Sequence, residues 1–328
     1  MSKLPDPSAP LDEATAYQAF ADLLDGGPSE DEIERFLTVM TERDETAIEI
    51  AAAASAMRER LIAIEAPEGA IDVCGTGGDG QHTLNVSTAV SLVIAALGVP
   101  VAKHGNRAAS SKAGASDTLE ALGLDLAHAG EYAERSLAQL NICFLHAANH
   151  HPAMKRITPI RKRIGKRTIF NLMGPISNPA RVTRQFIGIA RPDYVPVYAE
   201  ALEHLGAEGA MVVSGEEGLD ELSISGPSRI ACFGRVDTGT SVSPDDAGLD
   251  SHPIETIRGG DPDYNAAALR RLFDGETGGY RDAVLLNAAG ALIVAGRAGS
   301  WEHGVVQAAR AIDDGAAKDL LERWVAFR

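Results

Sequence analysis

Cysteine is scarce in this sequence: its 328 residues include only Cys74, Cys143 and Cys232. The number is odd, and no two of these residues have the short spacing of paired metal ligands. The sequence therefore gives no indication of a disulfide framework or a cysteine-based zinc site. Such cysteine usage is typical of a reducing compartment, and we expect a cytoplasmic protein.

Long apolar runs are also missing. The first residues, MSKLPDPSAPLDEATAYQ, lack the apolar core of a signal peptide. The most apolar stretch, residues 86–101, is short for a membrane span and is interrupted by hydroxyl side chains and Pro100. We therefore expect no membrane partner.

Acidic residues are absent from one long segment. Between Arg135 and Pro192 the chain has eleven Lys and Arg residues and no Asp or Glu, although the formal net charge of the whole chain is −16. The overall acidity argues against nucleic acid as a partner. The basic segment is either a solvated helix face balanced by acidic neighbours or an anion site, and charge alone leaves both interpretations open.

The length of the chain predicts two domains rather than one core. Residues up to about 61 have a helical pattern, with a capping-box signature at Ser29 and Glu32. An alanine-rich helix is predicted at residues 47–57. We expect the charged side chains of this region to face water: Glu49, Arg58 and Glu59.

Beyond residue 68, short β-rich runs alternate with helical segments, which predicts an α/β domain with a mostly parallel sheet. The predicted strands are residues 71–74, 99–105, 141–147, 185–190, 209–215, 228–234 and 283–296, the last ending in helix. A buried helix is predicted at residues 87–97. The predicted fold class is α/β, with a small N-terminal helical domain at residues 1–68 and a larger α/β domain at residues 69–328.

A glycine-rich loop follows the first predicted strand. Residues 75–80 read GTGGDG, and repeated glycine lets backbone N–H groups approach phosphate oxygens without interference from Cβ atoms. The loop lacks the Lys-Ser/Thr ending of nucleoside triphosphate loops, and no acidic residue between Asp79 and Asp117 could hold a dinucleotide ribose. A tight strand-to-helix turn is the alternative interpretation.

Two further stretches favour an anion site over a simple turn. NVST, at residues 85–88, offers amide and hydroxyl donors at a helix start. KHGNRAASSKAG, at residues 103–114, follows the second predicted strand, where ligands of open α/β sheets bind. The sequence therefore predicts two phosphate-type loops.

Six motifs occur in order: DVCGTGGDG, NVST, VAKHGNRAASS, HHPAMK, RTIFNLMGPISNPA and DELS. Together they resemble the anthranilate phosphoribosyltransferase family, from the N-terminal helices to about Ser225 and more weakly to the end. The resemblance implies a fold of the nucleoside phosphorylase/phosphoribosyltransferase type, with the helical domain completed by helices within about residues 162–182. It implies transfer of the phosphoribosyl group of 5-phosphoribosyl 1-pyrophosphate to the amine of anthranilate, in tryptophan biosynthesis. It also implies Mg²⁺ and a homodimer formed through the helical domain.

The resemblance assigns site residues as well. Those matched to the substrates are Gly75, Gly78, Asp79, Thr83, Asn85, Val86, Ser87, Thr88, Lys103, His104, Gly105, Asn106, Arg107, Ala108, Ala109, Ser110, Ser111, Ala115 and Arg161. Those matched to Mg²⁺ are Ser87, Asp220 and Glu221. Within the first set, Asn106 and Arg161 correspond to the anthranilate site, with His151 near it, and a guanidinium suits a planar carboxylate. Lys103 and Arg107 are natural countercharges for phosphate, although either could pair with an acid of the fold.

No catalytic nucleophile is expected. Cys74 lies beside the glycines, but its motif contains no base, and a small buried residue ending a strand is the favoured interpretation. The neutral aryl amine of anthranilate needs no strong base, so catalysis is expected to rest on positioning and charge stabilisation.

Some positions depart from the family pattern, and two alternative functions remain. Leu84, Ala115, His146 and Ala148 differ from the residues usual in the family, and these departures concern the acceptor more than the donor. A pyrimidine nucleoside phosphorylase would use inorganic phosphate and would not need the Asp220–Glu221 pair. A nucleic-acid-binding relative would draw support from the basic segment, but the global acidity and the intact donor motifs argue against it.

Overall fold

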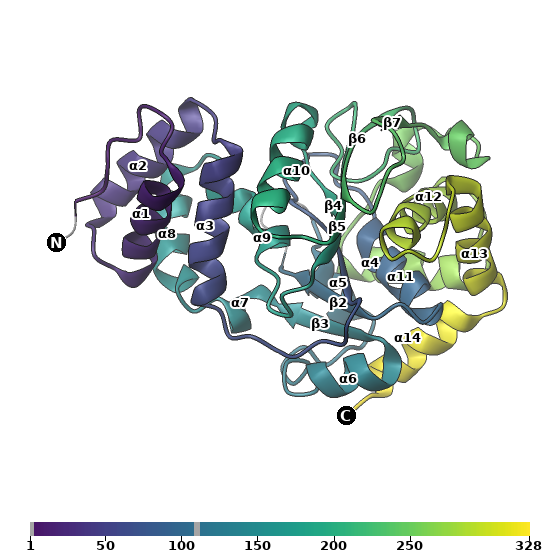
Figure 1. Ribbon diagram of the computed structural model, residues 1–328. Helices are drawn as coiled ribbons and strands as arrows, with labels where there is room; N and C mark the ends of the chain where they lie inside the picture. The colour runs from purple at the N-terminus through teal and green to yellow at the C-terminus, as the bar shows by residue number, and fades with distance from the viewer. Residues whose placement is uncertain (1–2, 108–111) are drawn as a thin grey trace.

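The computed structural model of the protein describes residues 3–107 and 112–328. The N-terminal part forms three helices, α1 (Glu13–Asp25), α2 (Glu30–Glu42) and α3 (Ala47–Glu59), at one end of the molecule (Figure 1). The predicted capping box of α2 is confirmed, because Ser29 Oγ accepts from the Glu32 N–H and the Glu32 carboxylate accepts from the Ser29 N–H. Ser29 therefore fixes the start of α2.

The expectation that Glu49 faces water is wrong. Its side chain is fully buried, and the carboxylate accepts from the backbone N–H groups of Leu11 and Thr46 and pairs with Arg43. Glu49 is the third residue of α3 and forms a second capping box with Thr46, the N-cap. The carboxylate is thus turned toward the helix start and the preceding loop, where every lone pair has a donor.

A seven-stranded sheet forms the centre of the described residues, in the order β3-β2-β1-β4-β5-β6-β7. The strands are β1 (Ile71–Gly75), β2 (Val101–Gly105), β3 (Ile142–His146), β4 (Arg184–Gly188), β5 (Gly209–Gly215), β6 (Ser228–Gly234) and β7 (Ser241–Val242). All neighbouring pairs from β3 to β5 are parallel, whereas the β5–β6 and β6–β7 pairs are antiparallel, so within the described sheet β6 runs opposite to the other strands. The predicted α/β class with a mostly parallel sheet is confirmed.

The strand predicted at residues 283–296 does not exist. Residues 283–294 belong to α12 (Gly279–Val294), a helix that is buried on nearly all sides, so only the predicted helical end of this run is confirmed. A short apolar run fits a buried helix and a buried strand equally well, so periodicity could not separate the two. Gly290 lets α12 approach the sheet closely, because a Cβ atom there would meet the ring of Phe186.

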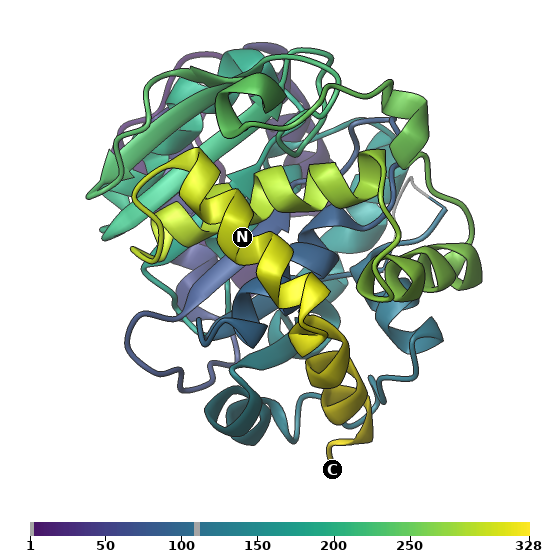
Figure 2. The same cartoon turned by 90° about the vertical axis from the view of Figure 1, so that its right-hand side faces the viewer.

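Helices cover both faces of the sheet. The remaining α-helices are α4 (Val86–Ala96), α5 (Ala115–Ala121), α6 (Ala133–Leu140), α7 (Ala147–His150), α8 (Met154–Ile164), α9 (Met173–Ile176), α10 (Val195–His204), α11 (Pro262–Phe273), α13 (Trp301–Asp313) and α14 (Ala316–Ala326). Short 3₁₀ helices span Ile169–Asn171, Pro192–Tyr194, Pro244–Ala247 and Ile254–Ile257. The C-terminal helices lie on the side of the sheet opposite the N-terminal ones (Figures 1 and 2).

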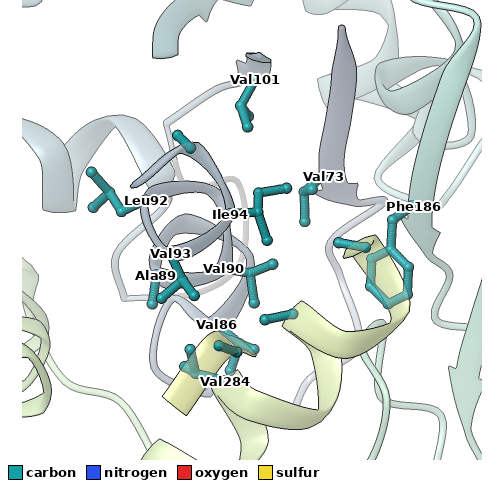
Figure 3. Close-up of a cluster of buried hydrophobic side chains, with 14 of the residues drawn as sticks. Val73, Val86, Ala89, Val90, Leu92, Val93, Ile94, Val101, Phe186 and Val284 are labelled. Atoms are coloured by element: carbon teal, nitrogen blue, oxygen red, sulfur yellow. The ribbon is translucent and has the colours of Figure 1, made fainter. Parts of the chain in front are cut away.

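Two large apolar cores result from this layering. On one face, α4 packs on β1 and α12, and Ile94 lies beside Val73 while Val86 lies beside Val284 (Figure 3). On the other face, residues of α1, α2, α3, α8 and α10 join Ile187 and Val212 of the sheet in one cluster. No helix among the described residues is long and apolar enough to cross a membrane.

Candidate active site

The candidate site lies where parallel strands end. β1 is hydrogen-bonded to β2 on one side and to β4 on the other, so the direction of chain progression reverses between β1 and β4. In open α/β sheets, ligands bind beside the carboxyl ends of the strands at such a switch point. The loops after β1, β2 and β5 carry the residues that the sequence singled out.

The glycine loop is in contact with the acidic pair. Gly77 N donates to Asp220 Oδ2 at 2.6 Å, although these residues are 143 positions apart. A Cβ atom at Gly75 would overlap the Asp220 carboxylate, and one at Gly188, where β4 ends, would overlap the Asp220 carbonyl group. Glycine is therefore required at two neighbouring strand ends so that the Asp220 segment can lie against them.

The start of α4 meets the second acid. Ser87 N donates to Glu221 Oε1 at 3.1 Å, so a helix N-terminus faces the carboxylate. Val86 and Thr88 are buried in the core beneath it. Thr83 pairs with Arg258 in an isolated β-bridge, and Asn85 is the N-cap of α4.

Lys103 reaches the same point from β2. Its side chain is 1% exposed, and Nζ donates to Val73 O at 2.8 Å and to Ser87 Oγ at 3.3 Å. Burial lowers the pKa of Lys103, while the nearby carboxylate of Asp72 acts in the opposite direction. The ammonium group is thus placed between the strand ends and the hydroxyl that was matched to Mg²⁺.

The acids are held in an electrostatically unfavourable arrangement. Burial, with the charge of Asp79, raises the pKa of Asp220 to about 7. Burial, with the charge of Asp220, raises the pKa of Glu221 to about 8. A bound cation would offset both effects, because it favours the ionised carboxylates.

The donor set fits magnesium better than an all-protein metal cage. Among residues 3–107 and 112–328, no group of three or more His, Cys, Asp and Glu side chains is arranged to hold a metal. Mg²⁺ in enzymes is commonly held by one or two carboxylates together with substrate phosphates and water. Asp220, Glu221 and the Ser87 hydroxyl match that pattern.

His104 lies on the side of the site nearer the N-terminal helices. Its Nδ1 is 2.8 Å from Gly174 O and its Nε2 is 3.3 Å from Nε2 of His151. Because a carbonyl oxygen only accepts, Nδ1 of His104 donates to Gly174 O. Burial lowers the pKa of His104 to about 3 and that of His151 to about 4.

Two predicted cationic groups are engaged with the fold itself. Arg107 forms ion pairs with Asp117 and Glu120, both at 2.9 Å. Arg161 donates to Asn171 Oδ1 at 3.1 Å, and burial lowers the pKa of Arg161. In the described part of the chain, no hydrogen bond or ion pair joins either of them to the glycine loop.

The remaining predicted residues follow β2. Gly105 ends this strand against Phe144, the Asn106 carbonyl accepts from Ser116 N, and Ala115 begins α5. The predicted contacts of Ala108, Ala109, Ser110 and Ser111 lie outside the described residues.

Sequence reasoning missed three groups in the site. Gly77 was not among the residues matched to the substrates, but it is the glycine that donates to Asp220. Arg167, one cation of the basic segment, was not matched to the site, but its guanidinium lies 3.3 Å from Gly78 O and 3.5 Å from Gly77 O. Gly188 gave no local signal, because one glycine at a strand end is unremarkable. A long-range contact decides its role.

Comparisons with known proteins agree with this geometry. Residues 3–61 match the helical bundle domain of a glycosyl transferase family, and residues 67–318 match the a/b domain of that family. Anthranilate phosphoribosyltransferase of Sphingopyxis alaskensis is 63% identical over 327 residues, which is 99% of this chain and 98% of the relative.

Solved structures give the same result. The crystal structure of anthranilate phosphoribosyltransferase from Thermus thermophilus has a TM-score of 0.92 at 42% identity, covering 97% of this chain and 96% of that one. The Saccharomyces cerevisiae enzyme in complex with PRPP and Mg has a TM-score of 0.85 at 28% identity, with coverages of 96% and 93%. The chain belongs to the anthranilate phosphoribosyltransferase family.

Proposed function

We propose that this protein transfers the phosphoribosyl group of 5-phosphoribosyl 1-pyrophosphate to the amine of anthranilate, giving N-(5-phosphoribosyl)anthranilate and pyrophosphate in tryptophan biosynthesis. The activity named for its curated relatives supports this function. The observation that carries the proposal is the contact between the glycine loop and Asp220, with Glu221 against the start of α4.

The donor site combines neutral groups with one buried cation. Backbone N–H groups of the glycine loop and of the α4 start suit phosphate oxygens, as does the hydroxyl of Ser87, and Thr88 is proposed to support this helix start from the core. Lys103 supplies positive charge from beneath. The other donor-matched residues, Gly75, Gly78, Asp79, Thr83, Asn85, Val86, His104, Gly105, Ala108, Ala109, Ser110, Ser111 and Ala115, are proposed to shape the same site.

Magnesium would be held by Asp220, Glu221 and Ser87. When bound, Mg²⁺ spreads the negative charge that develops on the departing pyrophosphate. The presence of Mg in the Saccharomyces cerevisiae complex supports this assignment. Both carboxylates must be ionised to bind it, and the opposing effects of burial and mutual repulsion would be relieved at the same time.

Anthranilate is proposed to lie near Asn106, Arg161 and His151. The guanidinium of Arg161 is half-buried and can form two parallel hydrogen bonds with a carboxylate. No covalent enzyme intermediate is needed, since the amine is already neutral and nucleophilic. Burial raises the pKa of Cys74 well above its ordinary value, so its thiol remains protonated and unreactive. Excluding water from the ribosyl carbon would then favour the amine over hydrolysis.

The organisation of the molecule is part of the proposal. We infer a helical domain at residues 1–68, completed by helices within about residues 162–182, and an α/β domain at residues 69–328. Ile157 and Ile160 of α8 are buried in the core of the N-terminal helices. This supports a helical domain whose second segment begins at α8, before residue 162. A homodimer through the helical domain and a cytoplasmic location are further parts of this proposal.

A fluorescence assay tests the function. Loss of anthranilate fluorescence should require both phosphoribosyl pyrophosphate and Mg²⁺, and removal of Mg²⁺ with EDTA should abolish it reversibly. The double variant Asp220→Asn/Glu221→Gln should lose at least a hundredfold in kcat/KM, because it retains shape and loses metal affinity. Turnover independent of the donor or of the acidic pair would contradict the proposal.

Two parallel measurements, of nucleoside cleavage and of DNA binding, separate the two alternatives. A pyrimidine nucleoside phosphorylase would cleave a nucleoside with inorganic phosphate and be insensitive to the Asp220→Asn/Glu221→Gln change. A nucleic-acid-binding relative would bind DNA tightly with no turnover, and its affinity would fall steeply with added salt.

A further inference from the structure

Asn85 has an unusual role for a helix N-cap. An N-cap asparagine normally accepts a hydrogen bond from the first turn of its helix, but the Asn85 side chain makes no such bond to α4. Its Oδ1 instead accepts from Thr118 Oγ1 at 2.5 Å and from Asn265 Nδ2 at 2.9 Å. The capping oxygen is therefore directed away from the helix N-terminus.

The orientation of Asn265 is fixed by its own partner. Its Oδ1 accepts from Gly260 N at 2.8 Å, so Nδ2 must be the atom that faces Asn85. Asn265 lies on α11 and is 2% exposed. Turning its amide would lose two hydrogen bonds in a buried setting, which is costly.

The surrounding backbone holds this arrangement in place. Leu84 N donates to Ile257 O at 2.7 Å, and Gly259 N donates to His82 O at 2.7 Å. A C-terminal segment, residues 257–260, thus runs against the loop that precedes α4. It brings Gly260 and the start of α11 close to Asn85.

We propose that Asn265 and Thr118 are positioning residues that set the polarity of the Asn85 amide, holding its oxygen inward so that its NH₂ group serves the phosphoribosyl donor. This inference rests on the proposed function. Among the described residues, Asn85 Nδ2 has one long contact, 3.4 Å to Ala113 O. A reversed amide would present its oxygen to an anionic ligand, which repels it, whereas the fixed amide presents donors only.

The last hundred residues gave no functional signal in the sequence, and this chain of contacts gives them a role. Gly260 N–H orients Asn265, Asn265 orients Asn85, and Thr118 supports the same oxygen from α5. A purely structural role for Asn265 would change stability, whereas a positioning role changes donor affinity through Asn85.

A double-mutant cycle distinguishes these roles. Calorimetry with inorganic pyrophosphate and Mg²⁺ gives Kd for the full-length protein and for Asn265→Asp, Asn265→Ala and Thr118→Val. Asn265→Asp keeps an acceptor for Gly260 N but loses the donor to Asn85, and Asn265→Ala removes the donor without adding charge. Each change is expected to raise Kd at least tenfold, with the KM for anthranilate changing less than twofold.

In the Asn85→Ala background, the same three changes should alter Kd less than twofold, and Thr118→Ser, which keeps the hydroxyl, should stay within twofold of the parent. Effects that persist undiminished without the Asn85 amide, or that appear only in thermal unfolding, would overturn the inference. If Asn265→Asp fails to fold, Thr118→Val tests the inference instead, because it removes the hydrogen bond that Asn85 Oδ1 receives from α5. If the protein binds pyrophosphate but transfers no phosphoribosyl group, the proposed function is refuted and the double-mutant cycle still tests the roles of Asn265 and Thr118. If it does not bind pyrophosphate at all, the proposed function and this inference are both refuted.

Discussion

Gly188 and Gly75 show how much a single missing side chain contributes to the site. Both lie at the ends of adjacent parallel strands, and the Asp220 segment crosses directly over them. The overlap at Gly188 is with backbone atoms of Asp220, which cannot rotate away as a side chain could. A methyl group there must displace the loop that carries both acids.

Gly188→Ala is therefore expected to separate Asp220 and Glu221 from the glycine loop. The KM for phosphoribosyl pyrophosphate should rise at least tenfold, and the Mg²⁺ concentration needed for half-maximal activity should also rise. Both are measured by anthranilate fluorescence. Gly299→Ala is the matched control, since a Cβ atom there meets nothing within 4 Å and its backbone is not left-handed. Equal behaviour of the two variants would show that the contact is unimportant.

Residues of the glycine loop could be predicted because their signal is local, whereas their partners could not. GTGGDG and NVST indicate N–H and hydroxyl donors from sequence alone. The roles of Gly188, Arg167 and Asn265 depend on contacts with Asp220, Gly78 and Asn85, which lie 32, 89 and 180 positions away along the chain. Arg107 and Arg161 were correctly seen as cations, but only the structure shows which acid or amide each of them contacts.

At the scale of elements, helix starts carry more information than helix interiors. The capping box of α2 was evident from Ser29 and Glu32, while that of α3 was overlooked because Glu49 looked like a surface residue. Conversely, α12 was mistaken for a strand because its apolar residues continue around the whole helix. Periodicity predicts an element well only when one face meets water.

Glu49→Gln should destabilise the N-terminal helices at neutral pH by about 3 kcal/mol, because Arg43 is left without its buried partner. Burial alone would raise the pKa of Glu49, but Arg43 and the N–H groups of Thr46 and Leu11 outweigh it and hold the pKa below 4.5. Chemical unfolding at several pH values, followed by circular dichroism, measures the difference.

The sign of the pH dependence follows from that lowered pKa. The ionised carboxylate contributes stability above the pKa of the unfolded chain, and this contribution is lost as pH falls through the lower folded pKa. The gap between parent and Glu49→Gln should thus be full near pH 7 and shrink below about pH 4.5. Glu42→Gln, an exposed change on α2, should stay within about 0.5 kcal/mol throughout. A gap that widens with acidity would contradict this account.

For the whole molecule, the central sheet joins the two apolar cores. Along β4 and β5, Phe186 and Met211 face the core of α4 and α12, while Ile187 and Val212 face the core shared with the N-terminal helices. The parallel strands read as nearly continuous apolar runs because both faces are covered. Since neighbouring residues of one strand serve both cores, we expect the two parts of the chain to unfold together.

Tyr198→Phe tests this coupling. Tyr198 lies on α10 between the sheet and the N-terminal helices, is fully buried, and donates through its hydroxyl to Leu172 O at 2.5 Å. Leaving that carbonyl unpaired should lower the free energy of unfolding by about 1 to 3 kcal/mol. Trp301 and Trp324 both lie in the C-terminal helices, so their fluorescence reports on the opposite face from the change, while far-ultraviolet circular dichroism reports on all helices. Both signals should shift together in urea, and the exposed Tyr264→Phe should shift neither. If the fluorescence transition stayed at its original midpoint while the dichroism split in two, the cores would be independent and the sheet would not join them.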